Sequence, residues 1–324
     1  MTTKEKLLKL FESNKGNYFS GEEIAQFLGI SRAAVWKAVN SLRSGGYAID
    51  AVTNKGYCLA ADTDIFSEPG IKQYLSPENQ NLEISVVSST QSTNDLMREK
   101  ANIGCAEGCV IVANEQTRGK GRSGRNFYSP SGTGAYLSIL LRPKDCSANQ
   151  SLRMTTMAAV AMCEAIRAVS GKDAQIKWVN DIFIDGRKVC GILTEGAFSM
   201  ETGLLEYAVL GAGINLYPPE SGFPEDLREI AGTVFDRSGS DLKNRIVAEF
   251  LNRFFAFYRS GDSETYTEKY RQYSFVIGRK ITVCSPEGER SAVATGIDDA
   301  CRLEVQYDNG ETGLLSYGEI RIRV

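Results

Sequence analysis

The chain has 324 residues, of which 42% are hydrophobic and 24% charged, an ordinary globular composition that excludes a disordered, collagen-like or coiled-coil protein. The 37 Lys and Arg residues and 40 Asp and Glu residues give a net charge of −3, so binding to nucleic acid would need a local basic patch. Histidine is absent, which excludes catalytic triads, Cys-His dyads and HExxH zinc sites, and favours electrostatic stabilisation by Lys, Arg and backbone N–H groups.

Residues 1–62 have the pattern of a winged helix-turn-helix domain. A capping box begins at Ser20, a glycine ends that helix at Gly29, and Ser31 is the expected N-cap of the next helix. A helix, a turn that contains glycine and a second helix form the unit that reads DNA. The predicted elements are helices at 4–12, 20–28 and 32–43 and wing strands at 47–52 and 57–60.

We expect the third helix of this domain to lie in the major groove of DNA. The residues expected to contact DNA are Ser31, Arg32, Ala33, Lys37 and Lys55. Between residues 31 and 58, four basic residues (Arg43 among them) and one acid give a local charge of +3, enough for a few phosphate contacts. Trp36 on the same helix is expected to pack against the domain. A three-helix protein-interaction module is the alternative.

Residues 63–273 mix strands with helices. Asp185 and Gly186 between two apolar runs indicate a hairpin. Consecutive hairpins predict a mixed or antiparallel sheet with helices on one face, hence an α+β fold. The expected strands are 82–88, 109–114, 135–141, 175–178, 182–184, 188–194 and 206–211, and the expected helices are 94–101, 151–169 and 241–258.

Residues 274–324 have the pattern of a small β-barrel. Short alternating strands are separated by turn signals such as Asp308-Asn309-Gly310. The expected strands are 280–284, 292–296, 302–307 and 319–324.

The segment 118–125, RGKGRSGR, holds four cations, three glycines and no acid. It matches GxGxxG literally, but a dinucleotide-binding loop opens a helix, and the residues that follow this one cannot continue a helix. We therefore predict a flexible cationic loop that closes over an anion, most simply a phosphate. A solvated basic surface loop is the alternative.

Polar residues also gather where predicted strands end. Ser92, Thr93 and Asn94 begin a helix, and Gln116 ends the strand before the cationic loop. Lys177 ends another strand, where it offers a point charge for a phosphate or carbonyl oxygen. Glycines at 191, 211 and 213 lie inside strands, which predicts a close approach of the ligand to the backbone.

The eight cysteines form no CxxC pair. Cys105 and Cys109 are the closest in sequence. A redox or metal role for this pair is the less favoured alternative, and we expect no metal site. The charged N-terminus does not resemble a signal peptide, and no apolar run reaches 18 residues. These features predict a reduced, cytoplasmic protein without a membrane segment.

These motifs together resemble the biotin protein ligases, specifically the bifunctional ligase and biotin-operon repressor group of the BirA type. The resemblance spans almost the whole chain. The winged-helix segment SGEEIAQFLGISRAAVWKAVNSLRSGGY is followed in order by STN at 92–94, the loop at 119–125, KWVND at 177–181, KVCGIL at 188–193 and GAGIN at 211–215.

The resemblance implies a class II synthetase-like ligase fold for residues 63–273 and an SH3-like barrel for 274–324. It implies that biotin reacts with ATP and Mg²⁺ to give biotinyl-5′-adenylate, and that biotin is then transferred to a lysine of a biotin carboxyl carrier protein. It also implies repression of biotin synthesis and uptake genes by a homodimer that binds the adenylate as corepressor.

The resemblance also assigns roles to individual residues. The implied catalytic residues are Lys177 and Arg122. The implied biotin-binding residues are Ser92, Thr93, Asn94, Gln116, Lys120, Gly121, Arg122 and Lys177. The implied adenylate- and ATP-binding residues are Arg122, Arg125, Phe127, Lys177, Asn180, Asn215 and Arg323.

The chain departs from the family pattern at three positions. Lys120 stands where Arg is usual, Val179 where Pro is usual, and Tyr217 where Asn is common. These departures concern local geometry and affinity more than the class of reaction. A regulator that senses ligand without catalysis and a ligase for lipoate remain the alternatives.

Overall fold

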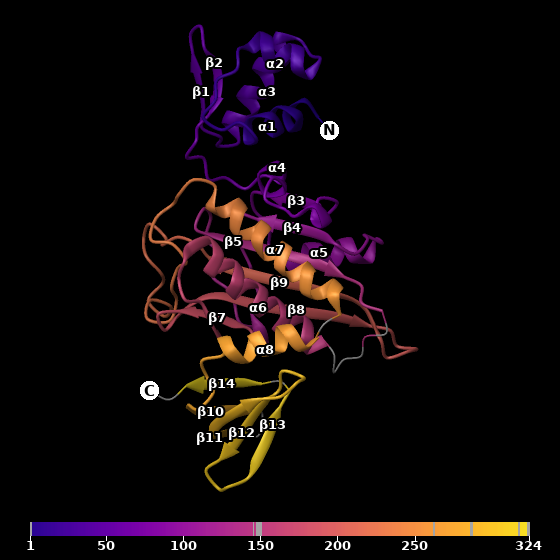
Figure 1. The fold of residues 1–324 in the computed structure, drawn as a ribbon, viewed down its shortest axis with the longest axis vertical. Coiled ribbons are helices and arrows are strands. Elements are labelled where there is room, and N and C mark those ends of the chain that lie inside the picture. Colours follow the sequence, from indigo (N-terminus) through magenta and orange to yellow (C-terminus); the bar gives the residue numbers. More distant parts are fainter. Residues whose placement is uncertain are drawn as a thin grey trace. The chain divides into compact units, whose positions relative to one another are not determined.

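The computed structural model describes residues 2–144, 146, 151–261, 263–285, 288–316 and 318–322 (Figure 1). It contains two compact units. The first comprises Met1–Gln80 with Arg237–Ala248, and the second comprises Asn81–Asp236 with Glu249–Val324. Residues 63–80, which the sequence pattern assigns to the middle domain, thus pack with the first unit.

The first unit contains the predicted winged helix-turn-helix. Ser20 caps its helix with a complete capping box, and Gly29 ends that helix in the left-handed conformation at φ 66°. Leu7, Val35 and Leu42 lie in its apolar core. The elements are α1 (Thr3–Glu12), α2 (Gly21–Leu28), α3 (Arg32–Ser44), β1 (Ile49–Val52), β2 (Gly56–Leu59), α4 (Glu68–Lys72) and the 3-10 helix η1 (Pro77–Asn79).

The second unit is built on a seven-stranded sheet in the order β3-β4-β5-β9-β8-β7-β6. Only the β3–β4 pair is parallel, so the sheet is mixed, as predicted. The strands are β3 (Glu83–Val87), β4 (Cys109–Ala113), β5 (Gly134–Leu141), β6 (Gln175–Lys177), β7 (Asp181–Ile184), β8 (Arg187–Phe198) and β9 (Leu205–Asn215).

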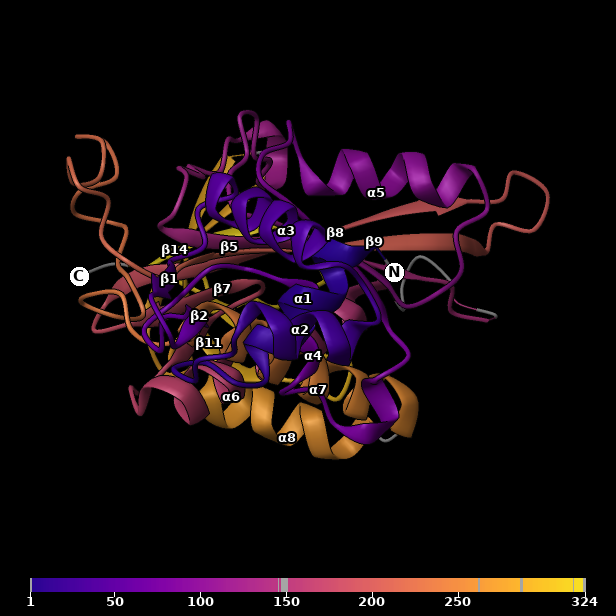
Figure 2. The ribbon, with the colours of Figure 1, turned by 90° about the horizontal axis from the view of Figure 1, so that it is seen from above.

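Helices cover both faces of this sheet, so the prediction of helices on one face is wrong. Helix α5 (Thr93–Asn102) lies on one face, whereas α6 (Ser151–Ser170) and α8 (Ser263–Tyr273) lie on the other (Figure 2). The parallel β3–β4 pair requires a crossover, and α5 supplies it. Helix α7 (Leu242–Ser260) begins in the first unit and continues into the second.

The C-terminal part of the second unit is a five-stranded antiparallel sheet in the order β13-β12-β11-β10-β14. Its strands are β10 (Lys280–Ser285), β11 (Gly288–Ile297), β12 (Leu303–Tyr307), β13 (Thr312–Leu315) and β14 (Glu319–Ile322). Strand β13 is an addition to the four predicted from the sequence.

Two of the eight cysteines are joined, because Cys105 and Cys109 form a disulfide. The expectation of reduced cysteines is therefore wrong for this pair. Among the other six, only Cys284 is not fully buried. Within the part of the chain that the structure describes, no helix has both the length and the apolar character needed to cross a membrane.

Candidate functional site

A cavity of about 350 Å³ opens in the second unit, a volume typical of small-ligand sites. Most of the side chains that the sequence predicted to bind ligand line it together, although they come from segments up to 88 residues apart. They are Ser92, Thr93, Asn94, Gln116, Lys120, Gly121, Arg122, Arg125, Phe127, Lys177 and Asn180.

The first turn of α5 contributes a hydrogen-bonded polar wall. Ser92 is the N-cap and accepts from the N–H of Asp95. The backbone N–H of Thr93 donates to Oε1 of Gln116 at 2.8 Å, and the Thr93 hydroxyl donates to the same oxygen at 3.1 Å. This contact fixes the strand end that carries Gln116 against the start of α5.

Two residues that sequence reasoning missed complete this wall. The fully buried Ser138 on β5 lies 2.6 Å from Oδ1 of Asn94 and 2.8 Å from Oγ1 of Thr93. Nδ2 of Asn94 donates to Glu195 on β8 at 2.7 Å. The sequence signal for Ser138 was its position as the one polar side chain within an apolar run. Buried polar groups that satisfy one another in this way hold a fixed donor and acceptor pattern toward the cavity.

The cationic loop lies along the cavity. Lys120 pairs with Asp95 at 2.6 Å, and Nη1 of Arg122 donates to Oδ1 of Asn180 at 3.1 Å. The N–H of Gly121 donates to the carbonyl of Arg125 at 2.7 Å, which closes the loop on itself. The loop is thus held to α5 on one side and to the segment after Lys177 on the other.

The in-strand glycines make room for side chains of this protein as well as for a ligand. A Cβ atom at Gly213 would lie 2.5 Å from the ring of Phe127, and one at Gly211 would lie 2.2 Å from Oδ1 of Asn94. Gly191, Gly211 and Gly213 all line the cavity, as expected for a close approach of ligand to the backbone, and Phe127 and Asn94 pack where their side chains would be.

The cavity is strongly cationic. Asp181 is the only acidic residue among the described lining residues, and it pairs with Lys188 at 2.6 Å. The cationic lining side chains are Lys120, Arg122, Arg125, Lys177 and Lys188. Lys188 was not among the predicted site residues. Five cations and one acid give the lining a formal charge of +4, which attracts a polyanion.

Two side-chain hydrogen bonds anchor the turn that follows Lys177. The indole N–H of the buried Trp178 donates to the carbonyl of Cys301 at 3.0 Å, and the hydroxyl of Tyr270 donates to the carbonyl of Val179 at 2.9 Å. Nζ of Lys177 lies 5.9 Å from the centre of the Phe183 ring. These anchors limit the motion of the strand end that carries Lys177.

The buried thiol beside the cavity is a poor nucleophile. Cys190 precedes the lining residue Gly191, and burial raises the pKa of its thiol far above the usual range. A thiol that stays protonated at neutral pH does not attack a substrate efficiently. The site therefore favours chemistry in which the ligands react with each other and the protein supplies charge.

Two residues predicted to contact the nucleotide are not among the described residues that line the cavity. Asn215 is absent from the described cavity lining, and its side-chain N–H donates to the carbonyl of Gly232 at 3.2 Å. Arg323 lies outside the described residues.

The predicted DNA-reading surface lies on α3 and the wing. Ser31 caps α3, and Arg32, Ala33 and Lys37 are exposed. Lys55 lies at the exposed wing turn, with Nζ 5.7 Å from the ring centre of Tyr18.

One expectation about this surface is wrong, and one basic residue has an additional role. The side chain of Trp36 is not packed into the domain but is 58% exposed. Arg43 donates to the carbonyl of Ile49 at 2.6 and 2.9 Å and so braces the wing, while its exposed guanidinium still counts toward the local charge.

Known proteins match most of the chain. Residues 86–215 match the biotin/lipoate A/B protein ligase family, residues 3–58 an HTH domain, and residues 276–323 the biotin protein ligase C-terminal domain. The bifunctional ligase/repressor BirA of Bacillus spizizenii is 34% identical over 316 residues, which is 95% of each chain. That of Escherichia coli is 26% identical over 90% of this chain and 89% of its own.

A solved structure gives the same result for the fold. The biotin protein ligase from Aquifex aeolicus in complex with biotin and ATP superposes with a TM-score of 0.61 at 22% identity, over 74% of this chain and 98% of its own.

Proposed function

The chain belongs to the biotin protein ligases of the bifunctional ligase/repressor type, and on this premise we propose that its cavity joins biotin to ATP as biotinyl-5′-adenylate. The observation that carries this proposal is the pairing of a polar wall, from Thr93 to Ser138, with a lining of formal charge +4 in one cavity. The wall offers fixed hydrogen bonds to the uncharged ureido group of biotin. The cations offer charge to its carboxylate and to the triphosphate.

In the first step, a carboxylate oxygen of biotin attacks the α-phosphorus of ATP, the new O–P bond forms, and pyrophosphate leaves. Negative charge on the non-bridging oxygens needs positive groups and no proton transfer, which suits a protein without histidine. We assign this stabilisation to Lys177 and to Arg122. In the second step, the ε-amine of a carrier-protein lysine attacks the biotinyl carbonyl, and AMP leaves.

We propose that a Mg²⁺ ion binds with the nucleotide, at the one carboxylate of the described cavity lining. Asp181 supplies the carboxylate that Mg²⁺ prefers, and the side chain is partly buried at the cavity wall beside Lys188. Bound there, the ion would offset charge on the departing pyrophosphate.

The function is tested by mass spectrometry of an acceptor fragment from a biotin-dependent carboxylase. We expect a mass increase of one biotinyl group when biotin, ATP and Mg²⁺ are all present. Lipoate and octanoate serve as competitors for adenylate formation. Adenylate formed only from lipoate would replace this proposal with a lipoate ligase, and formation of no adenylate would leave a ligand-sensing regulator.

Replacement of Asp181 with Asn is expected to raise the Mg²⁺ concentration for half-maximal adenylation roughly tenfold or more, because one charged ligand interaction is lost. A Mg²⁺ titration of pyrophosphate release measures this. Asp185→Asn is the matched control, since Asp185 lies in the exposed turn after β7 and outside the cavity lining. An unchanged Mg²⁺ requirement in Asp181→Asn would exclude Asp181 as the ligand.

Arg122→Gly is expected to release the bound adenylate roughly 10- to 100-fold faster, because the contact with Asn180 is lost and the loop gains freedom. A chase of labelled adenylate with unlabelled biotin and ATP gives the rate. Arg118→Gly adds the same flexibility at an exposed position outside the main cavity. Equal release rates from the two variants would count against a specific role for Arg122.

We propose that the adenylate-bound protein dimerises and that its two α3 helices bind the two halves of an operator. The exposed α3 residues and the HTH family match support this proposal. Repression of biotin synthesis and uptake genes would follow, and the protein would act in the cytoplasm, where its carrier-protein substrate is made.

Lys37→Ala is expected to weaken DNA binding and to lower the slope of log affinity against log salt by about 1, because one phosphate contact is removed. Fluorescence anisotropy at several salt concentrations measures this, with a duplex enriched from a random library by the adenylate-bound protein. Lys9→Ala, on an exposed face of α1, is the control. Identical salt slopes for wild type and Lys37→Ala would remove Lys37 from the interface.

A further inference from the structure

The disulfide between Cys105 and Cys109 connects the two elements that also form the polar wall. Cys105 follows the C-terminus of α5, and Cys109 is the first residue of β4. At the opposite ends of the same two elements, Thr93 of α5 donates to Gln116 just beyond β4. Helix α5 is therefore tied to β4 at both ends, once by hydrogen bonds at the cavity and once by sulfur.

Hydrogen bonds also hold the turn between the two cysteines. The N–H of Gly108 donates to the carbonyl of Leu140 at 2.9 Å, and Oε2 of Glu107 accepts from the N–H of Arg142 at 2.7 Å and from the hydroxyl of Tyr258 at 2.8 Å. Gly104 has φ +87° and Gly108 has φ +90°. The guanidinium of Arg142 donates to the carbonyls of Cys105 and Ala101 at 3.1 and 2.9 Å. The disulfide adds one covalent cross-link to these hydrogen bonds, and the two left-handed glycines allow the backbone between them to adjust when it opens.

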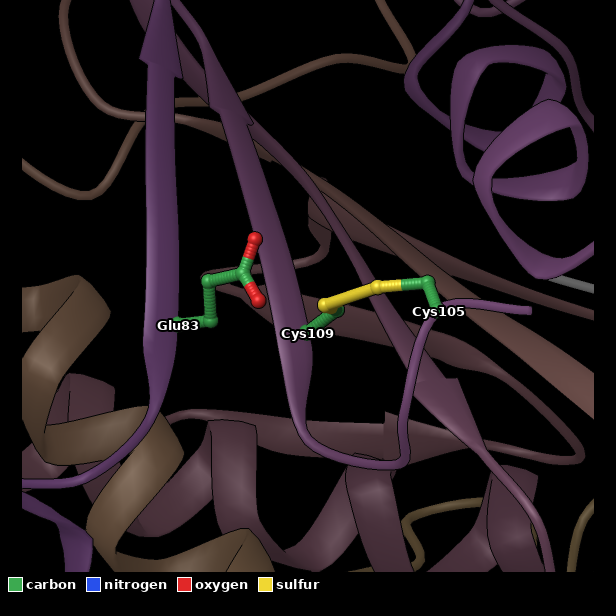
Figure 3. Close-up of side chains that lie close together, drawn as sticks. All are labelled: Glu83, Cys105 and Cys109. Carbon is green, nitrogen blue, oxygen red and sulfur yellow. A yellow bond between two sulfur atoms is a disulfide. The ribbon is translucent and has the colours of Figure 1, made fainter. Parts of the chain in front are cut away.

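Cys105 is the more accessible member of the pair, and Cys109 is buried. Cys105 is half-buried and lies two residues after Ile103, which is 85% exposed. Five of the six cysteines outside the pair are buried, and Cys284 is half-buried. The carboxylate of Glu83 on the neighbouring strand lies beside the two sulfurs, with all three ligand atoms within 4.8 Å of one another (Figure 3). That negative charge opposes two thiolates but not a neutral disulfide.

We propose that Cys105 and Cys109 form a reversible dithiol–disulfide pair that tunes ligand binding through α5, an inference that rests on the proposed function. Helix α5 has ten residues and is about 15 Å long, so it moves as one rigid element. With the disulfide closed, its C-terminus is fixed to β4 and its first turn is held in the geometry of the polar wall. Reduction removes this covalent tie and leaves the C-terminus held only by non-covalent contacts, such as those of Arg142 with Ala101 and of Tyr207 with Asn102. Part of the ordering of the wall then draws on the energy of ligand binding.

The oxidising reagent is a low-molecular-weight disulfide such as oxidised glutathione. The thiolate of Cys105 attacks one of its sulfurs and releases a glutathione thiolate. The thiolate of Cys109 then attacks the Cys105 sulfur of the mixed disulfide, and the second glutathione thiolate leaves. Two electrons pass from the pair to glutathione, and the two protons lost by the cysteines end on the two released thiolates.

The test equilibrates the full-length protein in glutathione buffers of increasing oxidation, then alkylates it and digests it with trypsin. Residues 101–118 contain both cysteines and lie between Lys100 and Arg118, so one peptide reports the pair. We expect two alkyl groups on this peptide in reducing buffer and none in oxidising buffer. Two alkyl groups at every glutathione ratio would overturn the proposal.

Calorimetric titration with biotin then compares the two forms. We expect the reduced form to bind biotin roughly fivefold more weakly, and Cys105→Ser to bind as weakly as the reduced form under all conditions. Cys284→Ser, which changes the other half-buried cysteine, should respond like the wild type. Equal affinity in both forms would overturn the regulatory role. Loss of biotin binding in both forms would overturn the proposed function, and the peptide titration would identify that case by still showing the redox pair.

Discussion

Lys177→Ala is expected to lower the rate of adenylate formation roughly 10²- to 10³-fold, a loss of about 2.7–4 kcal/mol of transition-state stabilisation. The proposed role places this ammonium group at the oxygens where charge develops as biotin attacks the α-phosphorus. The side chain ends β6, and the contacts of Trp178 with Cys301 and of Tyr270 with Val179 anchor the turn behind it. Since these anchors involve backbone carbonyls and neighbouring side chains, the substitution should leave the fold intact.

Single-turnover formation of labelled adenylate from biotin and ATP gives the rate, and circular dichroism checks the fold. Lys172→Ala is the matched control, because Lys172 precedes the same strand and pairs with the exposed Asp236. Lys177→Arg keeps a cation of different shape and should recover part of the rate. A rate for Lys177→Ala within threefold of the wild type would refute the assignment.

The helix-turn-helix was predictable because its boundaries rest on local chemistry. Ser20 with Glu23 and Gly29 act within a few residues of one another, and each does in the structure what its type favours. The strands of the central sheet were predictable for a similar reason, since a buried strand is a short apolar run. Hairpin signals, however, say nothing about the parallel β3–β4 pair, and so they did not indicate that α5 crosses the opposite face.

Helix α8 was missed because its sequence is mostly polar. Its buried residues include Tyr266 and Tyr270, which are spaced by four and were the available signal. An apolar stripe made of tyrosines is easily read as a surface segment, because each ring also carries a hydroxyl.

The site residues that lie in local motifs were predictable from the sequence. Those that come together only through strand pairing were not. Thr93, Asn94 and Gln116 stand out as polar residues at element ends. Ser138 and Glu195 reach Asn94 only through strand pairing, since β5 pairs with β9 and β9 with β8. No local pattern encodes that register. Arg43 is similar, because its hydrogen bond to the carbonyl of Ile49 follows from how the domain folds and not from a local pattern.

The second large effect is expected in the first unit, where Lys15→Met should lower the free energy of unfolding by about 3–5 kcal/mol. Nζ of Lys15 lies 2.9 Å from Glu12 and 2.8 Å from Asp241, and the side chains of these two acids are only 1% and 5% exposed. Removal of the cation would leave two carboxylates buried without their shared partner. Urea unfolding followed by circular dichroism, with hydrogen exchange of α1 amides, measures the loss. Lys6→Met, at an exposed position of α1, is the control.

The loss should depend on pH in a defined direction. Burial raises the pKa of Glu12 above its ordinary value, against the opposing hydrogen bond from Ser67 and the charge of Lys15. Because the folded state then holds this proton more tightly than the unfolded state, the contribution of Glu12 to stability falls as pH rises from about 4.5 through the raised pKa. Without Lys15 the pKa of Glu12 rises further, so the variant should lie closest to the wild type near pH 4.5 and furthest from it at neutral pH. A deficit that is constant across this range would show that Lys15 acts through packing of its aliphatic chain, not through charge.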